Sequence, residues 1–350
     1  MKKISKLLVG ILFSALVIAP SYAGEMTVTG GATATYTTNG DDAAAGKNIG
    51  ISNELDFTAS GELDNGYTWK YQVQLDGTTT ANDDTRLEIG TDMGTVGIYV
   101  SEGGLSAELH GVGAVGTGFD YASPASFETG YDVDGYSNIQ YHTPADMLPF
   151  GLTAKVGYVP NMSATTMLSA KESDSTFPSA AEGKDMQMLQ LAAAPIDGLS
   201  VKGDIAEVQG EGGQADGDDG ISANVSAKYT INQLSVGYAE GGYQPATGLT
   251  AGDNTITYES KFMGAQFDVN DALSVSYNRD ESTRSTRATS IVAGAAGTTA
   301  TDVAMEQTTL ALAYTVGGAT IGIADIEVDN SDYTPGRTET QTVVSLGISF

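Results

Sequence analysis

The strongest constraint on the fold is an alternation of apolar and polar residues with a period of two. It is clearest in YTWKYQVQLD (67–76), and it recurs in ISNELDFTASGEL (51–63), ISANVSAKYT (221–230) and VVSLGISF (343–350). A period of two places alternate side chains on opposite faces of an extended strand. No stretch has the apolar spacing of a three-turn amphipathic helix. The sequence therefore predicts an all-β protein.

The same reading predicts sixteen strands. Two of them, 255–268 and 319–329, change parity midway, which predicts either a bulge or a misplaced strand. The predicted strands are 25–36, 51–63, 67–76, 85–91, 94–100, 137–143, 152–159, 185–194, 199–208, 221–231, 234–243, 255–268, 272–281, 304–316, 319–329 and 339–350.

The connections between these strands alternate in length. Tight turns such as 64–66 (DNG), 232–233 (NQ) and 317–318 (GG) are each followed by a longer segment. In an up-and-down meander, this order places every short turn at one end and every long loop at the other. An even number of strands then leaves both chain ends at the short-turn end.

The position of the charges indicates the environment of the sheet. In the clearest strands, all charges share one parity, and the other parity carries apolar residues with Tyr36, Tyr71, Tyr99, Tyr158 and Tyr277 near strand ends. A membrane barrel requires this arrangement, because a basic residue on the lipid face at mid-depth costs about 2–4 kcal/mol. The charges expected to face inward are Glu54, Asp56, Lys70, Asp76, Arg86, Glu88, Lys155, Lys202, Asp204 and Lys228.

Strand number and composition indicate a wet interior. Barrels of about sixteen strands leave an aqueous channel, whereas eight-stranded barrels fill with side chains. The chain has 44 Asp and Glu against 16 Lys and Arg, a net charge of −28, which argues against nucleic acid as a partner. It has no Cys, so thiol chemistry and Cys-based metal sites are excluded.

The first 23 residues have the pattern of a secretory signal peptide. Lys2, Lys3 and Lys6 precede an apolar run of residues 7–19, and Ser21 and Ala23 supply a small-residue cleavage site. We expect cleavage after Ala23 and a single barrel domain over residues 24–350.

Together these features resemble the Gram-negative outer-membrane general porins, the trimeric sixteen-stranded type of alphaproteobacteria. The resemblance is carried by the signal peptide, EMTVTGGATATY (25–36), LEIGTDMGTVGIYVSEGG (87–104) and the terminal strand that ends at Phe350. It implies an outer-membrane location, contact with lipid and lipopolysaccharide, recognition of the Phe350 strand by the barrel-assembly machinery, and a homotrimer. The chain departs from the family in its few basic residues, since many porins line one wall with an arginine cluster.

The longest connection, residues 101–136, occupies the position of the loop that such porins fold into the barrel. We therefore expect this third long loop to narrow a passive diffusion channel for ions and small hydrophilic solutes. Its acidic residues predict a weak preference for cations. The candidates are Glu102, Glu108, Asp120, Glu128, Asp132 and Asp134 on the loop, opposed by Lys70 and Arg86 on the facing wall, with Lys47 as a weaker basic candidate.

Two other functions are open to the sequence. A secreted or surface-attached β-sandwich with an adhesive or structural role could share the alternation and the acidity. A barrel hydrolase would need a histidine-activated nucleophile, and the only histidines are His110 and His142, in unrelated segments. We predict no enzyme activity, cofactor or metal, and we interpret Arg279, Arg284 and Arg287 as a loop-surface patch.

Overall fold

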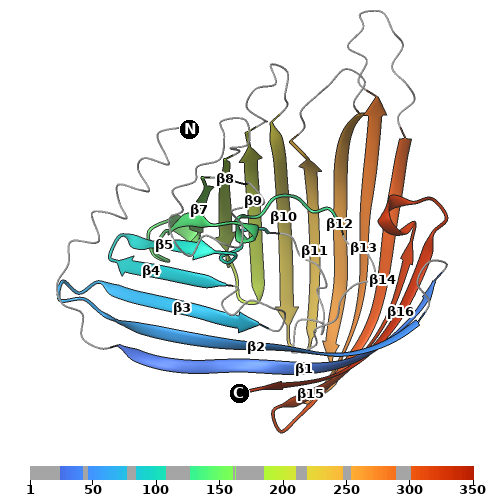
Figure 1. Ribbon diagram of the computed structural model, residues 1–350, viewed down its shortest axis with the longest axis horizontal. Coiled ribbons are helices and arrows are strands. Elements are labelled where there is room, and N and C mark those ends of the chain that lie inside the picture. Colours follow the sequence, from blue (N-terminus) through green and yellow to red (C-terminus); the bar gives the residue numbers. More distant parts are fainter. Residues whose placement is uncertain are drawn as a thin grey trace, which may run out of the picture.

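The chain forms one closed antiparallel β-barrel of sixteen strands (Figure 1). A computed structural model describes residues 24–41, 46–76, 84–107, 127–160, 162, 185–209, 219–246, 254–288 and 301–350. Each strand pairs with its neighbours in sequence, and β1 pairs with β16 to close the ring. This confirms the predicted fold and excludes a two-sheet sandwich. Among the described residues, no helix is long and apolar enough to cross a membrane.

The strands lie close to the ranges that the alternation predicts, and within the described residues three short 3-10 turns lie in the connections. These turns are η2 (Val133–Gly135), η3 (Pro149–Gly151) and η4 (Ser331–Tyr333). The strands are β1 (Glu25–Asp41), β2 (Gly46–Glu62), β3 (Thr68–Asp76), β4 (Thr85–Thr91), β5 (Gly94–Val100), β6 (Asn138–His142), β7 (Thr153–Val159), β8 (Met186–Ala193), β9 (Leu199–Val208), β10 (Gly220–Ile231), β11 (Leu234–Gln244), β12 (Asn254–Asp268), β13 (Leu273–Ala288), β14 (Thr301–Val316), β15 (Ala319–Asp329) and β16 (Thr338–Ser349).

Several strands extend further toward the long loops than the alternation predicts. β1 continues to Asp41 and β13 to Ala288, and β2 begins at Gly46. The outward residues in these extensions no longer follow a regular apolar pattern: Thr38 and Lys47 are polar, whereas Ile49 is apolar. Backbone pairing between strands therefore continues into residues where the alternation of apolar and polar side chains is lost. Lys47 lies on the outward face with Ile49 and Ile51, so it is not a lumenal basic residue.

The alternation of faces is confirmed along most of the barrel. In β10, Ile221 and Val225 are exposed on the outside, whereas Ser222, Asn224 and Ser226 are buried toward the lumen. The registers place all ten predicted inward charges on the lumenal face. Tyr99 is an exception among the tyrosines: it pairs with inward Arg86 and Asn138, and its hydroxyl donates to Glu88 Oε1 at 2.8 Å.

The expected bulge in 319–329 is absent. β15 pairs with β14 and β16 without a skipped residue, so Ile321 and Ile323 face outward while Ile326 and Val328 face inward. The parity change reflects an apolar patch on the inner wall. It consists of Val303, Met305, Ala311, Ala324, Ile326, Val328, Tyr333 and Val343, with Phe127 and Tyr258 packed against it.

Outward charges occupy the long-loop half of β11–β15, where the sequence analysis expected none. One cross-strand row runs from Glu240 through Lys261, Glu281 and Glu306 to Asp329. Arg279 pairs with Glu306 at 2.6 Å on the same face. The three arginines predicted as a loop patch all lie in β13, where Arg284 faces the lumen and Arg279 and Arg287 face outward.

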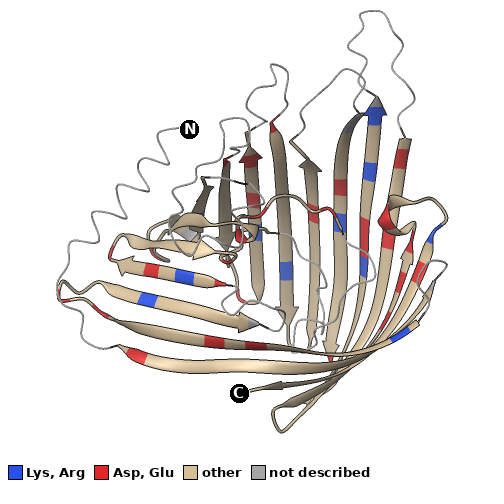
Figure 2. Cartoon of the chain, in the orientation of Figure 1, with Lys and Arg blue, Asp and Glu red and all other residues tan. Residues whose placement is uncertain are grey.

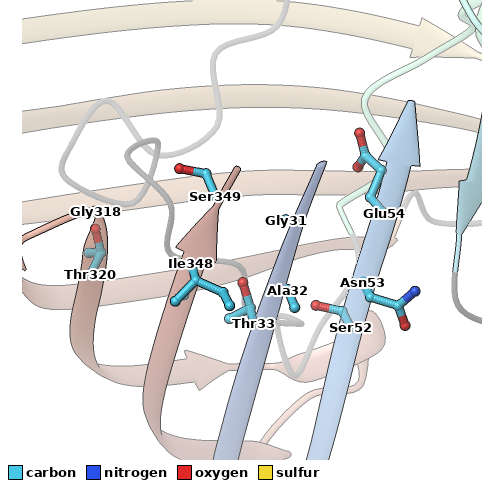
Figure 3. Close-up of a pocket in the computed structure, with 11 residues that line it drawn as sticks. Gly31, Ala32, Thr33, Ser52, Asn53, Glu54, Gly318, Thr320, Ile348 and Ser349 are labelled. Carbon is cyan, nitrogen blue, oxygen red and sulfur yellow. The ribbon is translucent and has the colours of Figure 1, made fainter. Parts of the chain in front are cut away.

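The barrel closes where the two ends of the described chain meet. The pairing runs from Gly31 opposite Ser349 to Asp41 opposite Glu339, and Phe350 extends it to Gly30. Small residues at this seam leave a hollow of about 400 Å³ (Figure 3). Glu54 is the charged residue among those that line it, and backbone pairing between β1 and β16 runs along the seam.

Candidate functional site: the lumen and its inward-folded loop

The third long connection, here called loop 3, joins β5 to β6, and its described limbs lie inside the barrel. The structure describes its first limb (residues 101–107) and its second limb (residues 127–137). Leu105, Ala107 and Val133 are fully buried, which a loop projecting into solvent would not show. The inward fold of this connection is therefore confirmed for the described limbs, while Glu108, Asp120 and His110 lie outside the described residues.

The first limb is fixed to the inner wall by its backbone. Gln190 Nε2 on β8 donates to Leu105 O at 2.7 Å, and the Ala107 N–H donates to Asp204 Oδ2 on β9 at 2.6 Å. Gly103 has a φ of +84°, and a Cβ there would lie 2.5 Å from Gln140 Nε2. Glycine is required at this position because the chain turns inward against the wall in a left-handed conformation.

The second limb is tied to the first. Asp132 caps η2 by accepting the Val133 N–H, and it also accepts the N–H groups of Leu105 and Ser106 at 2.7 and 2.8 Å. Val133 and Leu105 pack together in a buried cluster on β7–β9 with Val159, Met186, Met188, Ala206 and Val208. The apolar residues of this inner wall serve as a seat for the loop.

The second limb then crosses to the next part of the wall. The Tyr131 N–H donates to Ser222 Oγ on β10 at 3.1 Å, and the Tyr131 ring meets Tyr243 of β11 edge-on at 5.1 Å. Phe127 packs edge-on against Phe262 of β12 with ring centroids 5.7 Å apart. The described limbs of loop 3 thus contact the lumenal face from β7 to β12.

The acidic candidates of loop 3 have different surroundings. Glu102 is half-buried and forms an ion pair with Arg86 at 3.0 Å. Asp132 is used in backbone capping, as described above, so its carboxylate has a structural role. Glu128 and Asp134 are exposed. Among the described loop carboxylates, Glu128 and Asp134 are therefore the exposed ones, and Glu102 is half-buried in its ion pair.

The two basic candidates lie on β3 and β4 among acidic and amide partners. Lys70 is directly opposite Ser60 and Glu88. Arg86 joins a chain of polar contacts, in which Gln72 Nε2 donates to Asp56 Oδ1 at 2.8 Å and Arg86 donates to Gln72 Oε1. Arg86 is thus paired with Glu102 at the root of the loop rather than placed across open water from it.

Burial changes the acidity of Glu102. Desolvation raises the pKa of its carboxyl above the ordinary glutamate value; Arg86 opposes this shift and Glu88 adds to it. Glu102 Oε2 is also buried without a hydrogen-bond partner among the described residues. The loop root therefore holds a carboxyl that accepts a proton more readily than an ordinary glutamate does.

Three lysines form the basic side of the lumen. Lys155 on β7, Lys202 on β9 and Lys228 on β10 all face inward near the short-turn ends of their strands. Lys202 and Lys228 are diagonal neighbours across the β9–β10 ladder. Among the described residues, none forms an ion pair with any of the three. Below, they are called the lysine face.

An acidic wall lies opposite the lysine face. In a ring of sixteen, β2 is eight places from β10, so the two strands face each other across the lumen. Acidic residues lie along β2, and basic residues occur on β3, β4 and β10 (Figure 2). Glu54, Asp56 and Glu62 of β2 face inward. The lumen therefore carries opposite charge on opposite walls.

Sequence reasoning placed these lysines and Asp204 inside the barrel but gave them no role. Their parity was the available signal. The contact of Asp204 with Ala107 depends on where loop 3 meets the wall, and strand parity does not specify that. His142, weighed and rejected as a catalytic or metal-binding residue, lies in the lumen with its Nε2 2.7 Å from Gln140 Oε1 and its ring stacked on Tyr99 at 6.0 Å.

The architecture is similar to that of several solved outer-membrane proteins. The anion-selective porin of Comamonas acidovorans has a TM-score of 0.64 and 15% identity, over 93% of this chain and all of that one. OmpT of Vibrio cholerae, in its trimer form, has a TM-score of 0.63 and 13% sequence identity, over 94% of this chain and all of that one. Salmonella typhi OmpF in complex with daunomycin has a TM-score of 0.55 and 13% sequence identity, over 95% of this chain and all of that one.

These similarities establish the sixteen-stranded porin-like barrel fold. No protein-family model and no curated protein sequence matches the chain. At such low identity, the roles of residues in those proteins cannot be transferred to this chain.

Proposed function

We propose that the protein is a passive diffusion channel for ions and small hydrophilic solutes across the outer membrane of a Gram-negative bacterium. The inward fold of loop 3 carries the proposal. A sixteen-stranded barrel encloses a water-filled interior, and a loop seated against the inner wall narrows it. The similarity to solved porins supports the same function.

The pore is proposed to prefer cations weakly. Glu102, Glu128 and Asp134 of loop 3 and the acidic wall of β2 raise the local cation concentration, and the lysine face opposes them on the other side. The constriction proposal keeps Glu108 and Asp120 as loop carboxylates and Lys70 and Arg86 as basic residues of the wall. Opposite charges on facing walls create a transverse field that orients dipolar solutes.

Planar-bilayer recording of the detergent-purified protein tests this function. Discrete conductance steps are expected, and under a KCl gradient the reversal potential should have the sign of cation preference. The absence of steps from protein that is demonstrably folded would remove the channel proposal. A clear anion-selective sign would remove only the selectivity.

Residues 1–23 are proposed to be a cleaved export signal, which delivers the barrel domain of residues 24–350 to the outer membrane. Phe350 is proposed to carry the signal for the barrel-assembly machinery, since its ring is exposed and outward-facing at the end of β16. Amino-terminal sequencing of protein from outer membranes should begin at Gly24. An intact Met1 would contradict cleavage.

A homotrimer is proposed, with the outer face around the seam as the subunit contact. Ile49 and Ile51 on β2 are 78% and 72% exposed, and Ala32 and Ala34 beside them leave room for close approach. The remaining outer surface is proposed to contact lipid and lipopolysaccharide. The mass of the detergent-solubilised complex, and conductance steps in groups of three, test the trimer. A monomeric mass would contradict it.

A further inference from the structure

Residues 330–337, the connection between β15 and β16, form a tightly bonded segment with an uncommon backbone. We call this segment the strap. Three of its non-glycine residues have left-handed φ angles: 52° at Asn330, 50° at Asp332 and 54° at Tyr333. Such conformations are costly for residues with a Cβ and persist only where surrounding contacts enforce them.

The contacts that enforce this backbone lie within the strap and at the adjoining strand ends. Asn330 Nδ2 donates to Ala304 O and Asn330 Oδ1 accepts the Gly336 N–H, both at 2.8 Å. Arg337 forms an ion pair with Asp332 at 2.7 Å and a second with Glu339. The strap is therefore built as a rigid unit.

The strap directs Tyr333 into the barrel wall, where it is only 5% exposed. The Tyr333 hydroxyl lies 2.8 Å from Ser282 Oγ on β13. Arg284 Nη2 donates to Tyr333 O at 3.1 Å, and the guanidinium lies over the ring at 5.2 Å. The Tyr258 ring meets it edge-on at 5.3 Å.

Tyr333 also contacts loop 3. The Glu128 N–H donates to Tyr333 Oη at 3.3 Å, and Phe127, the preceding residue, packs with the apolar patch that includes Tyr333. An aromatic row continues from Tyr333 through Tyr258 and Tyr243 to Tyr131 of the same limb, with successive centroids 5.3, 5.6 and 5.1 Å apart. The second limb is thus held at both ends of this row.

We propose that the strap sets the position of loop 3, with Tyr333 as the positioning residue that fixes the second limb at Glu128. This inference rests on the proposed channel function. Glu128 is itself exposed, so its position on the second limb depends on contacts made by its backbone rather than by its side chain. Tyr333 supplies that tether from a segment about two hundred residues away in sequence.

The test is single-channel recording of three variants. Tyr333→Phe keeps the ring and removes both hydroxyl contacts. Ser282→Ala removes one partner of the hydroxyl and leaves the tyrosine intact. Tyr333→Ala removes the ring as well. Tyr314→Phe, on the outer face of β14, is the matched control for loss of a tyrosine hydroxyl. Barrel formation is checked by heat-modifiable gel mobility.

Tyr333→Phe is expected to raise the frequency of brief current fluctuations by about fivefold, the effect of losing one ordinary hydrogen bond on a two-state population. Ser282→Ala should give a smaller rise, and Tyr333→Ala should also increase mean conductance. If Tyr333→Ala does not fold, the recordings of Tyr333→Phe and Ser282→Ala decide whether the strap positions loop 3.

The strap proposal is overturned if Tyr333→Phe and Ser282→Ala are folded and match both the wild type and Tyr314→Phe in conductance and noise. A folded wild type that does not conduct would instead remove the channel function on which the proposal rests. The two failures are therefore distinguishable in one set of recordings.

Discussion

Phe350 and Gly30 exchange two backbone hydrogen bonds, each 2.9 Å long, so the last residue of the chain completes the ladder between β16 and β1. Deleting Phe350 should therefore destabilise the closed barrel by about 1–3 kcal/mol, the net value of two backbone hydrogen bonds. The measurement is the urea midpoint of heat-modifiable gel mobility for protein refolded in detergent.

Phe350→Ala separates closure of the barrel from recognition by the assembly machinery, because it keeps both backbone hydrogen bonds and removes the exposed ring. We expect it to refold in detergent as the wild type does but to accumulate less in outer membranes. Normal accumulation in cells would show that the terminal ring has no part in assembly.

The raised pKa of Glu102 predicts that ion preference depends on pH. Its folded-state pKa lies above the ordinary glutamate value of about 4.3, so Glu102 takes up a proton while exposed carboxylates are still ionised. Arg86 then loses its counter-charge, and the lumen gains positive charge. Cation preference, measured as reversal potential, should fall as the pH is lowered from neutrality toward the ordinary glutamate value.

Glu102→Gln should show this reduced preference already at pH 7 and should respond less to acid. Glu240→Gln, on the outer face, is the control and should behave as the wild type. The same rise in the pKa of Glu102 determines how its contribution to stability changes with pH. The folded chain binds this proton more tightly than the unfolded chain, so the Glu102 contribution to stability declines as the pH rises from the ordinary value through the folded one.

Asp204 offers a test of how the first limb of loop 3 is held. Asp204→Ala leaves the buried Ala107 N–H and Asn224 Nδ2 without their acceptor, at a cost of about 1–3 kcal/mol. We expect the limb to leave the wall and single-channel conductance to change, with Asp204→Asn intermediate because it keeps one acceptor oxygen. Glu207→Gln, on the outer face of β9, should leave conductance unchanged. Equal conductance in all four proteins would contradict the anchoring role.

Much of the fold follows from the sequence because a period of two is imposed by one apolar and one aqueous environment. That constraint is strong on β10, where Val225 and Ser226 point to opposite faces. It weakens where the outward residues lose their regular apolar pattern, and the extensions of β1 and β13 were missed for that reason. It misled at Ile326 and Val328, since an apolar residue can face inward where a loop packs against the wall.

The site was less accessible to sequence reasoning. The resemblance to porins, together with the position of residues 101–136 in the chain, was enough to identify the loop that folds inward. It did not pair Arg86 with Glu102, because that contact depends on where the loop leaves β5. Nor could Asp132 be recognised as a backbone cap, since its partners Leu105 and Ser106 lie 27 and 26 residues away in sequence.

The lysine face predicts a change in selectivity with a definite sign. Changing Lys155, Lys202 and Lys228 together to Gln removes three positive charges from one wall of the lumen and leaves the opposing acidic wall intact. Cation preference should increase, and the effect should shrink in high salt because free ions screen these charges. Lys261→Gln, an outward charge on β12, is the control. An unchanged reversal potential in the triple variant would show that the lysines do not act on permeating ions.

The assignment of faces can be tested by moving one charge across the barrel wall. Val225 lies in the middle of β10, faces outward and is 53% exposed, whereas Ser52 faces the wet lumen from β2. Val225→Arg should destabilise the folded protein in lipid vesicles by about 2–4 kcal/mol, because a guanidinium at mid-depth must enter hydrocarbon. Ser52→Arg should cost little, because its side chain stays in water. Folding free energies from urea titration in vesicles measure both. Equal costs for the two variants would mean that the apolar outer face does not meet lipid.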